Sequence, residues 1–319
     1  MMSRRAMLLL LTLFAFAITA NDARAEDKLR VGKAVAGPFD FVPLDIGMAK
    51  GFFKANGIEV EEVDFDGSAK LQQGLGARAI DVGLGSGPEL AFVAKGNSDL
   101  AIAVFAGPPN SQVLVVRADG PVKSVADLKG RKIGLSTVGS LTDWLLRELS
   151  RQQGWGPDGI DGVALGSESG RTAALRAGSI DGMVIDVATA TKLEKEKTGR
   201  IVVHFGSVAP NFIIHAIFAT NKAIAERPDA LKRFLAGWFE TITWMRAHKD
   251  ETVALAAPVM HQDLQIVAMN YDETMNDFST TGRFDAKALA VLARSFVEMK
   301  TLPSEPDMSK LYTEKLLPR

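Results

Sequence analysis

The chain contains no cysteine in its 319 residues. It therefore has no disulfide, no thiolate metal ligand, no thiol nucleophile and no cysteine that could carry a lipid. Its stability must come from a buried core. A chain of this length forms an ample one, because such chains bury roughly three quarters of the surface that the unfolded chain exposes.

Histidine and net charge are also scarce. The four histidines show no H-x-x-x-H pair, so we predict no metal site and no cofactor, and we interpret each as structural or exposed: His204, His215, His248 and His261. The formal net charge is −1, and no basic stripe runs along the sequence. Nucleic acid is therefore not an expected partner, because its phosphates require such a stripe.

Long apolar runs are absent except near the N-terminus. Arg4 and Arg5 precede an apolar run over 6–20, and an Ala-Arg-Ala site ends at Ala25. This pattern predicts a secretory signal peptide rather than a membrane anchor, because the run is shorter than the about 20 residues that span a bilayer. We predict cleavage after Ala25. The arginine pair fits twin-arginine export poorly, which favours the general secretory route, and a soluble exported protein of this kind is expected in the periplasm.

From residue 29 onward, short apolar segments alternate with amphipathic ones. In the first part, strands are expected at 29–35, 58–65, 80–84, 100–105 and 112–116, with helices at 41–54, 69–75 and 88–95. The rhythm restarts after 119–121, with strands at 132–135, 162–165, 181–185, 201–205 and 213–219, and the chain is mostly helical from 221 onward. This alternation predicts an α/β fold with mainly parallel sheets flanked by helices.

A faint internal repeat suggests that this fold occurs twice. The segment ARAIDVGLGSGPELA at 77–91 aligns with AGSIDGMVIDVATAT at 177–191, which superposes Ile80-Asp81 on Ile180-Asp181. Two related α/β lobes would produce this match, and a chance similarity between two βαβ units is the alternative. Because no low-complexity linker separates the halves, we expect short hinge strands to join the lobes.

The glycine-rich stretch DVGLGSGPEL at 81–90 resembles several anion-binding or catalytic loops, but it fits none of them. The glycines miss the spacing of a dinucleotide loop, the Gly-Lys of a P-loop is absent, and Ser86 lacks the flanking glycines of a nucleophile elbow. Pro88 suits the first turn of a helix. We therefore predict a helix N-terminus whose free N–H groups and Ser86 hydroxyl bind a ligand, with Gly85 and Gly87 in the same loop.

A second polar loop occurs in the stretch KIGLSTVGSLTDWLL at 132–146. Ser140 is a good helix N-cap with Asp143 three residues on. The loop holds more small hydrogen-bonding residues than a cap requires, namely Ser136, Thr137, Gly139, Ser140 and Thr142. Since ligands of open α/β sheets bind beyond the carboxyl ends of strands, we expect the two polar loops to face each other across a cleft.

Other loops at strand ends supply further candidate ligand-binding residues. Aromatic walls and a carboxylate follow the first strand, an amide precedes the first crossing between lobes, and hydroxyl, guanidinium and carboxylate groups follow later strands: Phe39, Asp40, Phe41, Asn110, Ser169, Arg171 and Asp186. A surface position for Arg171 and a helix cap for Asp186 are the alternatives to a ligand contact.

Several longer phrases resemble the periplasmic solute-binding proteins of ABC importers, in the branch that serves nitrate, sulfonates, taurine and pyrimidine precursors. They occur in the expected order along the whole mature chain: IGMAKGFFKANGIEVEEVDF, SVADLKGRKIG, LRAGSIDGMVID and IFATNKAIAERPDALKRFLAGW. The resemblance implies the two-lobe (type II) binding-protein fold, with a first lobe at 26–112 plus 218–319 and a second at 113–217. It also implies a small-molecule ligand in the cleft and transient contact of the monomeric protein with a membrane permease.

The resemblance also bears on catalysis. Enzymes within this superfamily, a desulfinase and a pyrimidine synthase, use cysteine, so their chemistry does not carry over and we expect no enzyme. A periplasmic sensor for a membrane receptor and an exported hydrolase remain alternatives. The class of ligand stays open, because serines and helix N-termini suit a sulfonate, carboxylate or nitrate, whereas Asp40 and Asp186 suit an amine, a ring N–H or a zwitterion.

Overall fold

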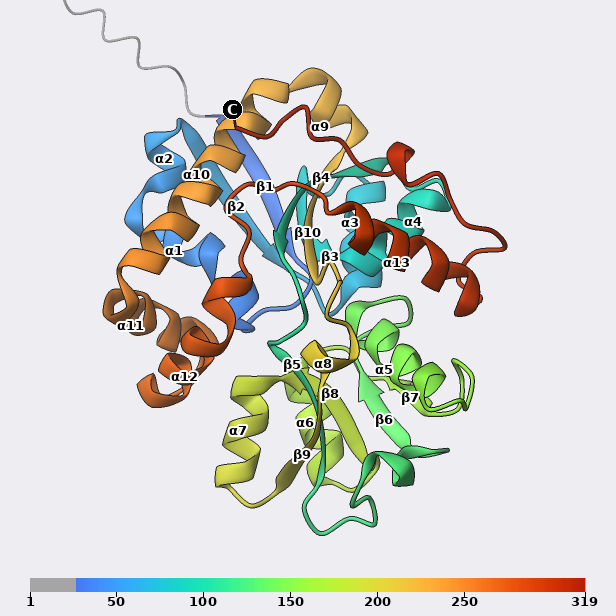
Figure 1. Ribbon diagram of the computed structural model, residues 1–319. Helices are drawn as coiled ribbons and strands as arrows, with labels where there is room; N and C mark the ends of the chain where they lie inside the picture. The colour runs from blue at the N-terminus through green and yellow to red at the C-terminus, as the bar shows by residue number, and fades with distance from the viewer. Residues whose placement is uncertain (1–26, 319) are drawn as a thin grey trace, which may run out of the picture.

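The computed structural model describes residues 27–318, so the predicted signal peptide and its cleavage site lie outside the described residues. Within this range the strands form two five-stranded sheets, which occupy the upper and lower lobes in Figure 1. We call these the first and second lobes.

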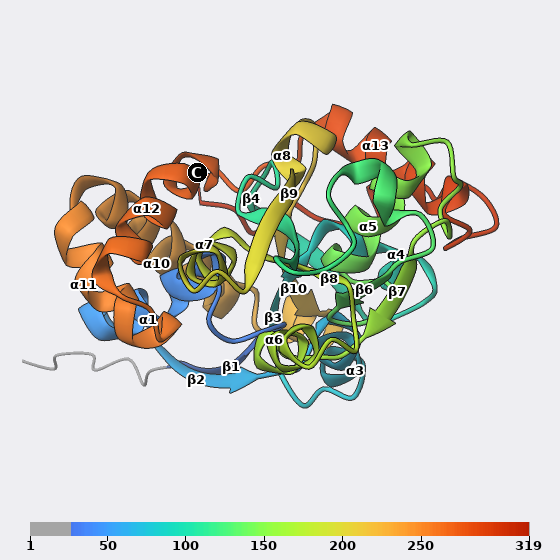
Figure 2. The same cartoon turned by 90° about the horizontal axis from the view of Figure 1, so that it is seen from below.

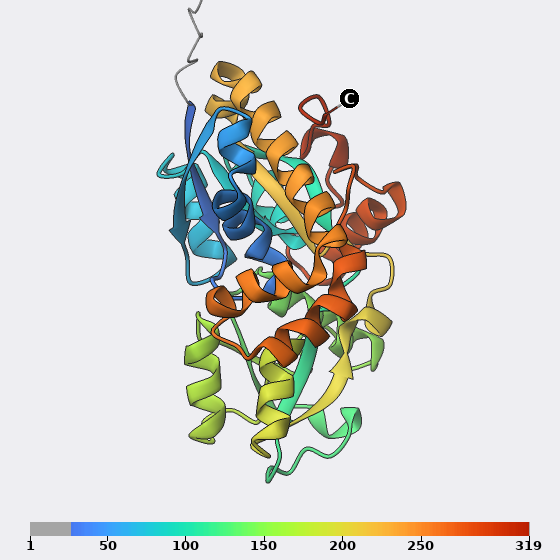
Figure 3. The ribbon, with the colours of Figure 1, turned by 90° about the vertical axis from the view of Figure 1, so that its left-hand side faces the viewer.

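The first sheet has the strand order β2-β1-β3-β10-β4. Its strands are β1 (Asp27–Lys33), β2 (Ile58–Asp64), β3 (Val82–Ser86), β4 (Asp99–Ala106) and β10 (His215–Thr220). The helices of this lobe are α1 (Val42–Lys50), α2 (Phe52–Ala55), α3 (Ser68–Gly76), α4 (Leu90–Ala94), α9 (Asn221–Glu226), α10 (Pro228–Ala247), α11 (Lys249–Met260), α12 (Leu264–Thr274) and α13 (Ala286–Glu298). Helices α1, α2 and α10 cover one side of the sheet, and α3, α4 and α13 lie on the other (Figures 1 and 3).

The second sheet has the strand order β7-β6-β8-β5-β9. Its strands are β5 (Gln112–Arg117), β6 (Lys132–Leu135), β7 (Asp161–Ala164), β8 (Gly182–Asp186) and β9 (Gly199–His204). Its helices are α5 (Leu141–Gln152), α6 (Glu168–Arg176), α7 (Val187–Lys195) and the short α8 (Phe205–Val208).

The predicted α/β fold is confirmed, but each sheet is mixed rather than mainly parallel. In the first sheet β10 runs antiparallel to both β3 and β4, and in the second sheet β5 runs antiparallel to both β8 and β9. These are the two strands that arrive from the other lobe. Each enters its new sheet from the side at which the neighbouring strands have their C-terminal ends. Its direction is therefore antiparallel to theirs.

The two crossings lie at 107–111 and 205–214. Gln112 therefore belongs to the second sheet and His215 to the first, whereas the predicted division ran at 112/113 and 217/218. The predicted and observed lobe boundaries differ by a few residues because the hinge segments lead into apolar strands, and the hydropathy pattern does not change where a strand begins. Everything after β10 packs on the first lobe, where Ala101 of β4 exchanges backbone hydrogen bonds with Leu311 and Thr313.

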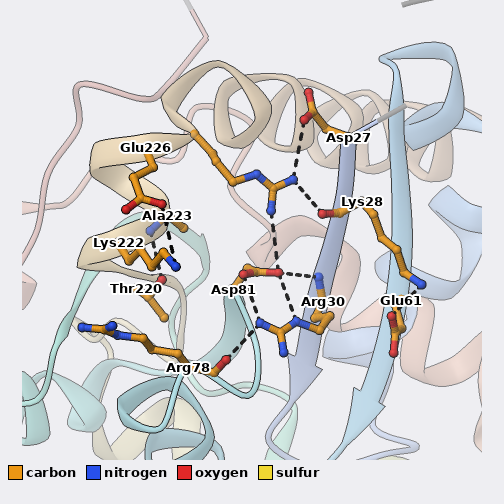
Figure 4. A network of polar contacts seen from close by, with 11 residues as sticks. Asp27, Lys28, Arg30, Glu61, Arg78, Asp81, Thr220, Lys222, Ala223 and Glu226 are labelled. Atoms are coloured by element: carbon orange, nitrogen blue, oxygen red, sulfur yellow. Dashed lines mark hydrogen bonds and ion pairs between the residues drawn. The ribbon is translucent and has the colours of Figure 1, made fainter. Parts of the chain in front are cut away.

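The internal repeat has a structural cause in the two lobes. In the first lobe the Asp81 carboxylate accepts a hydrogen bond from the backbone N–H of Arg30 at 2.9 Å (Figure 4). In the second lobe the Asp181 carboxylate accepts one from the backbone N–H of Lys132 at 3.0 Å. Each aspartate therefore joins its strand to the neighbouring parallel strand in the same way, which favours related lobes over chance similarity.

Candidate functional site

A small cavity of about 40 Å³ lies where the two lobes meet and is called the inner cavity below. Its first-lobe wall comes from the loops after β1 and β3 and from the start of β10, and its second-lobe wall comes from the start of β5, the loop after β6 and the first turns of α5 and α6. Most of these segments begin where a strand ends, the usual place for ligands in α/β folds.

Six of the predicted site residues line the inner cavity, and they come from both lobes: Phe41, Gly85, Ser86, Ser136, Thr142 and Arg171. The other nine predicted residues are not part of its lining: Phe39, Asp40, Gly87, Asn110, Thr137, Gly139, Ser140, Ser169 and Asp186. Nine lining residues were not predicted, of which five are polar or charged: Ala34, Val35, Pro38, Leu141, Ser68, Glu89, Gln112, Glu168 and His215.

The first polar loop differs from its prediction because Glu89 uses its donors. The backbone N–H and the hydroxyl of Ser86 both donate to Glu89 Oε1, at 2.9 and 3.2 Å, and Gln72 donates to Glu89 Oε2 at 2.8 Å. A 3₁₀ turn at Gly87–Glu89 then leads into the short helix α4. The two Ser86 donors of the predicted anion site are therefore bound to a fully buried carboxylate, and ligand binding at this helix N-terminus stays a prediction.

The second polar loop forms a buried cluster of hydroxyl groups. The Ser136 hydroxyl lies 2.9 Å from that of Ser140 and 3.1 Å from that of Thr142, and the Thr142 hydroxyl accepts from the Ser136 N–H at 2.9 Å. We call Ser136, Ser140 and Thr142 the hydroxyl cluster. Ser140 caps α5 as predicted, accepting from the Asp143 N–H, but Asp143 accepts from Gly139 rather than from the cap residue.

Thr137, from the same loop, contacts the opposite lobe. Its hydroxyl accepts a hydrogen bond from the backbone N–H of Ala69 at 3.3 Å, in the first turn of α3. On the other side of the molecule, Trp144 of α5 donates to the Ser295 hydroxyl of α13 at 2.9 Å and stacks on Phe212 with ring centroids 4.0 Å apart. Figure 2 shows α5 beside α13. The lobes thus touch on both sides of the inner cavity, which is a closed arrangement.

A charged group of three side chains lies at the second-lobe wall, with Arg171 and Glu168 in the lining and Asp186 behind them. Arg171 is 2% exposed and donates to the Gly166 carbonyl at 2.6 Å, while its Nε has no hydrogen-bond partner among the described residues. Burial raises the pKa of Glu168 well above its usual value, and the neighbouring Asp186 carboxylate raises it further, against the effect of Arg171. Asp186 caps α7 through Thr189 at 2.9 Å, and its Oδ2 is without a partner in the described chain. One cation therefore serves two carboxylates.

His215, which we had interpreted as structural or exposed, is buried and lines the inner cavity. Its Nδ1 lies 3.1 Å from the Gly85 carbonyl, which can only accept, so Nδ1 donates there, and Nε2 lies 3.5 Å from Asp40 Oδ2. The rings of Phe41 and Phe105 hold the imidazole on two sides, at 4.8 and 5.1 Å. Asp40 therefore acts on the cavity through His215.

Three other predicted residues have partners away from the cavity. Phe39 packs edge-on against Tyr271 and Phe278 in the core. Asn110, in the first crossing, donates to both carboxylate oxygens of Asp277 at 3.0 Å. Ser169 hydrogen-bonds with Ser167 at the first turn of α6 and faces a larger cleft.

The larger cleft, of about 490 Å³, adjoins the inner cavity and shares Val35 and Glu168 with it. It is called the outer cleft below. Its first-lobe walls are residues 35–37, 64–66 and 260–262, and its second-lobe walls are residues 167–169, 172–173, 176, 189 and 192–193. Glu168 thus stands at the junction of the two spaces.

Behind Glu89, side chains lead away from the cavity toward a second buried carboxylate. Gln72, which donates to Glu89, accepts from Asn97 at 2.8 Å. Burial and the neighbouring Glu89 carboxylate raise the pKa of Asp99 to about 7. Burial also raises the pKa of Glu89, although hydrogen bonds from Ser68, Gln72 and Ser86 oppose that shift.

We expect the Asp99→Asn variant to be more stable than the wild type at neutral pH. Because the folded-state pKa is raised, the wild type loses stability as pH rises from the usual aspartate pKa toward about 7, and the variant lacks this loss. Its advantage should grow by about 2 kcal/mol between pH 5 and 7 in urea unfolding curves. Asp119→Asn at an exposed turn is the control. Parallel profiles for wild type and Asp99→Asn would contradict the assignment.

Two properties of the described range bear on function. No helix within residues 27–318 is long and apolar enough to cross a bilayer. In that same part of the chain, no group of three or more His, Asp or Glu side chains is placed to hold a metal ion.

Comparison with known proteins gives consistent matches in sequence and fold. The family described as NMT1/THI5 like matches residues 39–252. A 4-amino-5-hydroxymethyl-2-methylpyrimidine phosphate synthase of Candida albicans is 25% identical over 239 residues, covering 70% of this chain and 69% of that protein. A putative aliphatic sulfonates-binding protein of Escherichia coli is 26% identical over 222 residues, covering 67% of this chain and 66% of that protein.

Among solved structures, the alkanesulfonate-binding protein SsuA of Xanthomonas axonopodis pv. citri, bound to MOPS, superposes with a TM-score of 0.77 at 18% identity. The superposition covers 90% of this chain and 98% of that one. The fold is therefore that of the periplasmic binding proteins, and the resemblance drawn from the sequence is confirmed.

Proposed function

Because the chain belongs to the NMT1/THI5-like family, we propose that it is the solute-binding component of an ABC importer. It captures a small organic anion or zwitterion between its lobes and delivers it to a membrane permease. The expected location is the periplasm. Relatives named as sulfonate-binding proteins support this proposal, as does the periplasmic binding fold.

The observation that carries the proposal is the set of unpartnered polar atoms around the inner cavity. Arg171 Nε and His215 Nε2 are buried, belong to lining residues and have no hydrogen-bond partner among the described residues. Native proteins pair nearly all buried polar groups, so such atoms call for a partner from outside the chain. One of these residues comes from each lobe, so a single ligand can contact both.

Contacts to both lobes explain how binding would drive closure. A ligand held by Arg171 and the hydroxyl cluster in the second lobe gains Phe41 and His215 only when the first lobe has closed over it. Its affinity for the closed arrangement therefore exceeds its affinity for an open one, and that difference shifts the population toward closure. The permease would then recognise the surface that the two closed lobes create.

The alternatives are a sensor and an enzyme. Some relatives are named as synthases, but this chain has no thiol. Within residues 27–318, His215 forms no hydrogen bond to a serine hydroxyl, and Ser86 donates to Glu89 instead. This arrangement gives a hydrolase no activated nucleophile. A sensor would share the fold, and permease and ATPase genes beside the coding gene would favour import over sensing.

We expect a thermal-shift screen of refolded, ligand-free protein to identify one chemical class. The panel contains sulfonates, carboxylates, nitrate, taurine and pyrimidines. A ligand at 100 times its dissociation constant adds about 2.7 kcal/mol, which raises the midpoint by several degrees for a protein of this size. Protein that keeps the same midpoint with every compound would contradict the proposed function.

A further inference from the structure

The inner cavity is rich in carboxylates and poor in cations. Glu89 and Glu168 both line it, and Asp186 lies against Glu168. Arg171 is the one arginine or lysine among the lining residues in the described part of the chain. Glu89 and Asp186 are 0% and 2% exposed. Buried carboxylates need a nearby positive charge or a proton. Here Arg171 acts on two of them, Glu168 and Asp186, whereas Glu89 is held by hydrogen bonds from Ser68, Gln72 and Ser86.

The hydrogen bonds show which carboxylate is least satisfied. Glu89 accepts from Ser86 twice and from Gln72 once. Glu168 accepts from the Thr189 hydroxyl at 3.5 Å, and its other side-chain hydrogen bond is with the acidic Asp186 rather than with a cation. An ionised carboxylate has about four acceptor sites, so Glu168 has several of them free toward the cavity or the outer cleft.

From these contacts we infer that the ligand carries a basic nitrogen, which Glu168 binds and whose positive charge Glu89 and Asp186 help to hold. The inference rests on the proposed solute-binding function and specifies its substrate class. A ligand with only an anionic group would bring another acidic group into a cavity where three carboxyl groups lie close to a single guanidinium. A ligand with a cationic nitrogen offsets one of the three, and any acidic group that it also carries finds Arg171 and the hydroxyl cluster.

The position of Glu168 fits this role. It is shared by the inner cavity and the outer cleft, so a nitrogen bound there lies at the junction of the two. A substituent on that nitrogen can extend into the outer cleft, which has about 490 Å³. Part of the inner wall is apolar or aromatic, with Val35, Phe41 and Leu141, and this part suits a compact hydrocarbon or a ring.

Protonation gives a second readout of the same contact. Without a bound cation, Glu168 retains a proton beyond the pH at which a free glutamate loses it, because of burial and the Asp186 carboxylate. A cationic nitrogen removes the need for that proton. Binding of a protonated amine should therefore release up to about one proton, which calorimetry in buffers of different ionisation enthalpy detects.

The test compares pairs of compounds that differ by one amino group: taurine with ethanesulfonate, β-alanine with propionate, and 4-aminopyrimidine with pyrimidine. Isothermal titration calorimetry measures the dissociation constant of each. In at least one pair we expect the amino compound to bind about 10- to 100-fold more tightly, the usual gain from a hydrogen bond to a charged group.

Glu168→Gln is the matched variant, because it keeps the size of the side chain and removes the charge. It should bring the ratio of the two dissociation constants within each pair close to one, and it should abolish proton release. Glu196→Gln, at an exposed ion pair on the same lobe, should change neither quantity. Nitrogen-free partners that bind as tightly as the amino compounds would overturn the inference and leave the proposed function standing. Absence of binding by every compound would contradict the proposed function and the inference together.

Discussion

Replacing Arg171 with methionine is expected to lower the free energy of unfolding by about 3–5 kcal/mol at neutral pH. Methionine fills much of the same space but leaves Glu168 and Asp186 in the wall without their cation. Ligand affinity should fall by about 100-fold, because a charge-assisted donor is lost from the cavity. Chemical unfolding and calorimetry measure the two effects.

The double variant Arg171→Met/Glu168→Gln separates the loss of charge balance from the loss of shape. It removes one carboxylate together with the guanidinium, so it should recover much of the lost stability without recovering affinity. The deficit of the single variant should also shrink as pH falls, because a protonated Glu168 needs no cation. If Arg171→Met were as stable as the wild type at every pH measured, Arg171, Glu168 and Asp186 would not be electrostatically coupled.

Replacing Trp144 with alanine is expected to open the lobes and to cost about 3–5 kcal/mol of stability. Trp144 belongs to the second lobe, yet its ring stacks on Phe212 of the crossing segment and its N–H donates to Ser295 of the first lobe. The alanine variant loses both contacts. Small-angle X-ray scattering should show a larger radius of gyration than for the wild type, and urea unfolding should show the loss of stability.

Trp144→Phe is the matched control, because it keeps an aromatic ring against Phe212 and removes only the hydrogen bond to Ser295. It should cost about 1 kcal/mol and leave the scattering close to that of the wild type. If the alanine variant scattered like the wild type, the contact between α5 and α13 would not be what holds the closed arrangement.

The sequence predicts the fold well where local pattern and topology agree. The repeated Ile-Asp pair predicts two related lobes, and the bonds of Asp81 and Asp181 to the neighbouring strands explain it. The direction of β5 and β10 could not be predicted, because it depends on which lobe each strand enters and not on its own residues.

The candidate site was predicted unevenly for a similar reason. Ser136, Thr142 and Arg171 follow strand ends, and that rule of topology locates them. Glu89, three residues after Ser86, completes a capping box that the sequence displays, so the bonds between these two residues could have been predicted. Nothing in its neighbourhood marks His215, because the groups that make it important, Gly85 and Asp40, lie more than a hundred residues away in the chain.

The place of β10 between β3 and β4 has a consequence for biosynthesis. The second sheet is built from one continuous stretch, from β5 to β9. The first sheet is incomplete until residue 220 has been synthesised, because β10 takes the place between β3 and β4. Until then β3 and β4 have no shared neighbour and present unpaired edges, which are prone to aggregation. The second lobe can therefore finish folding before the first, and a nascent chain halted before β10 carries an exposed, incomplete first sheet that chaperones would recognise.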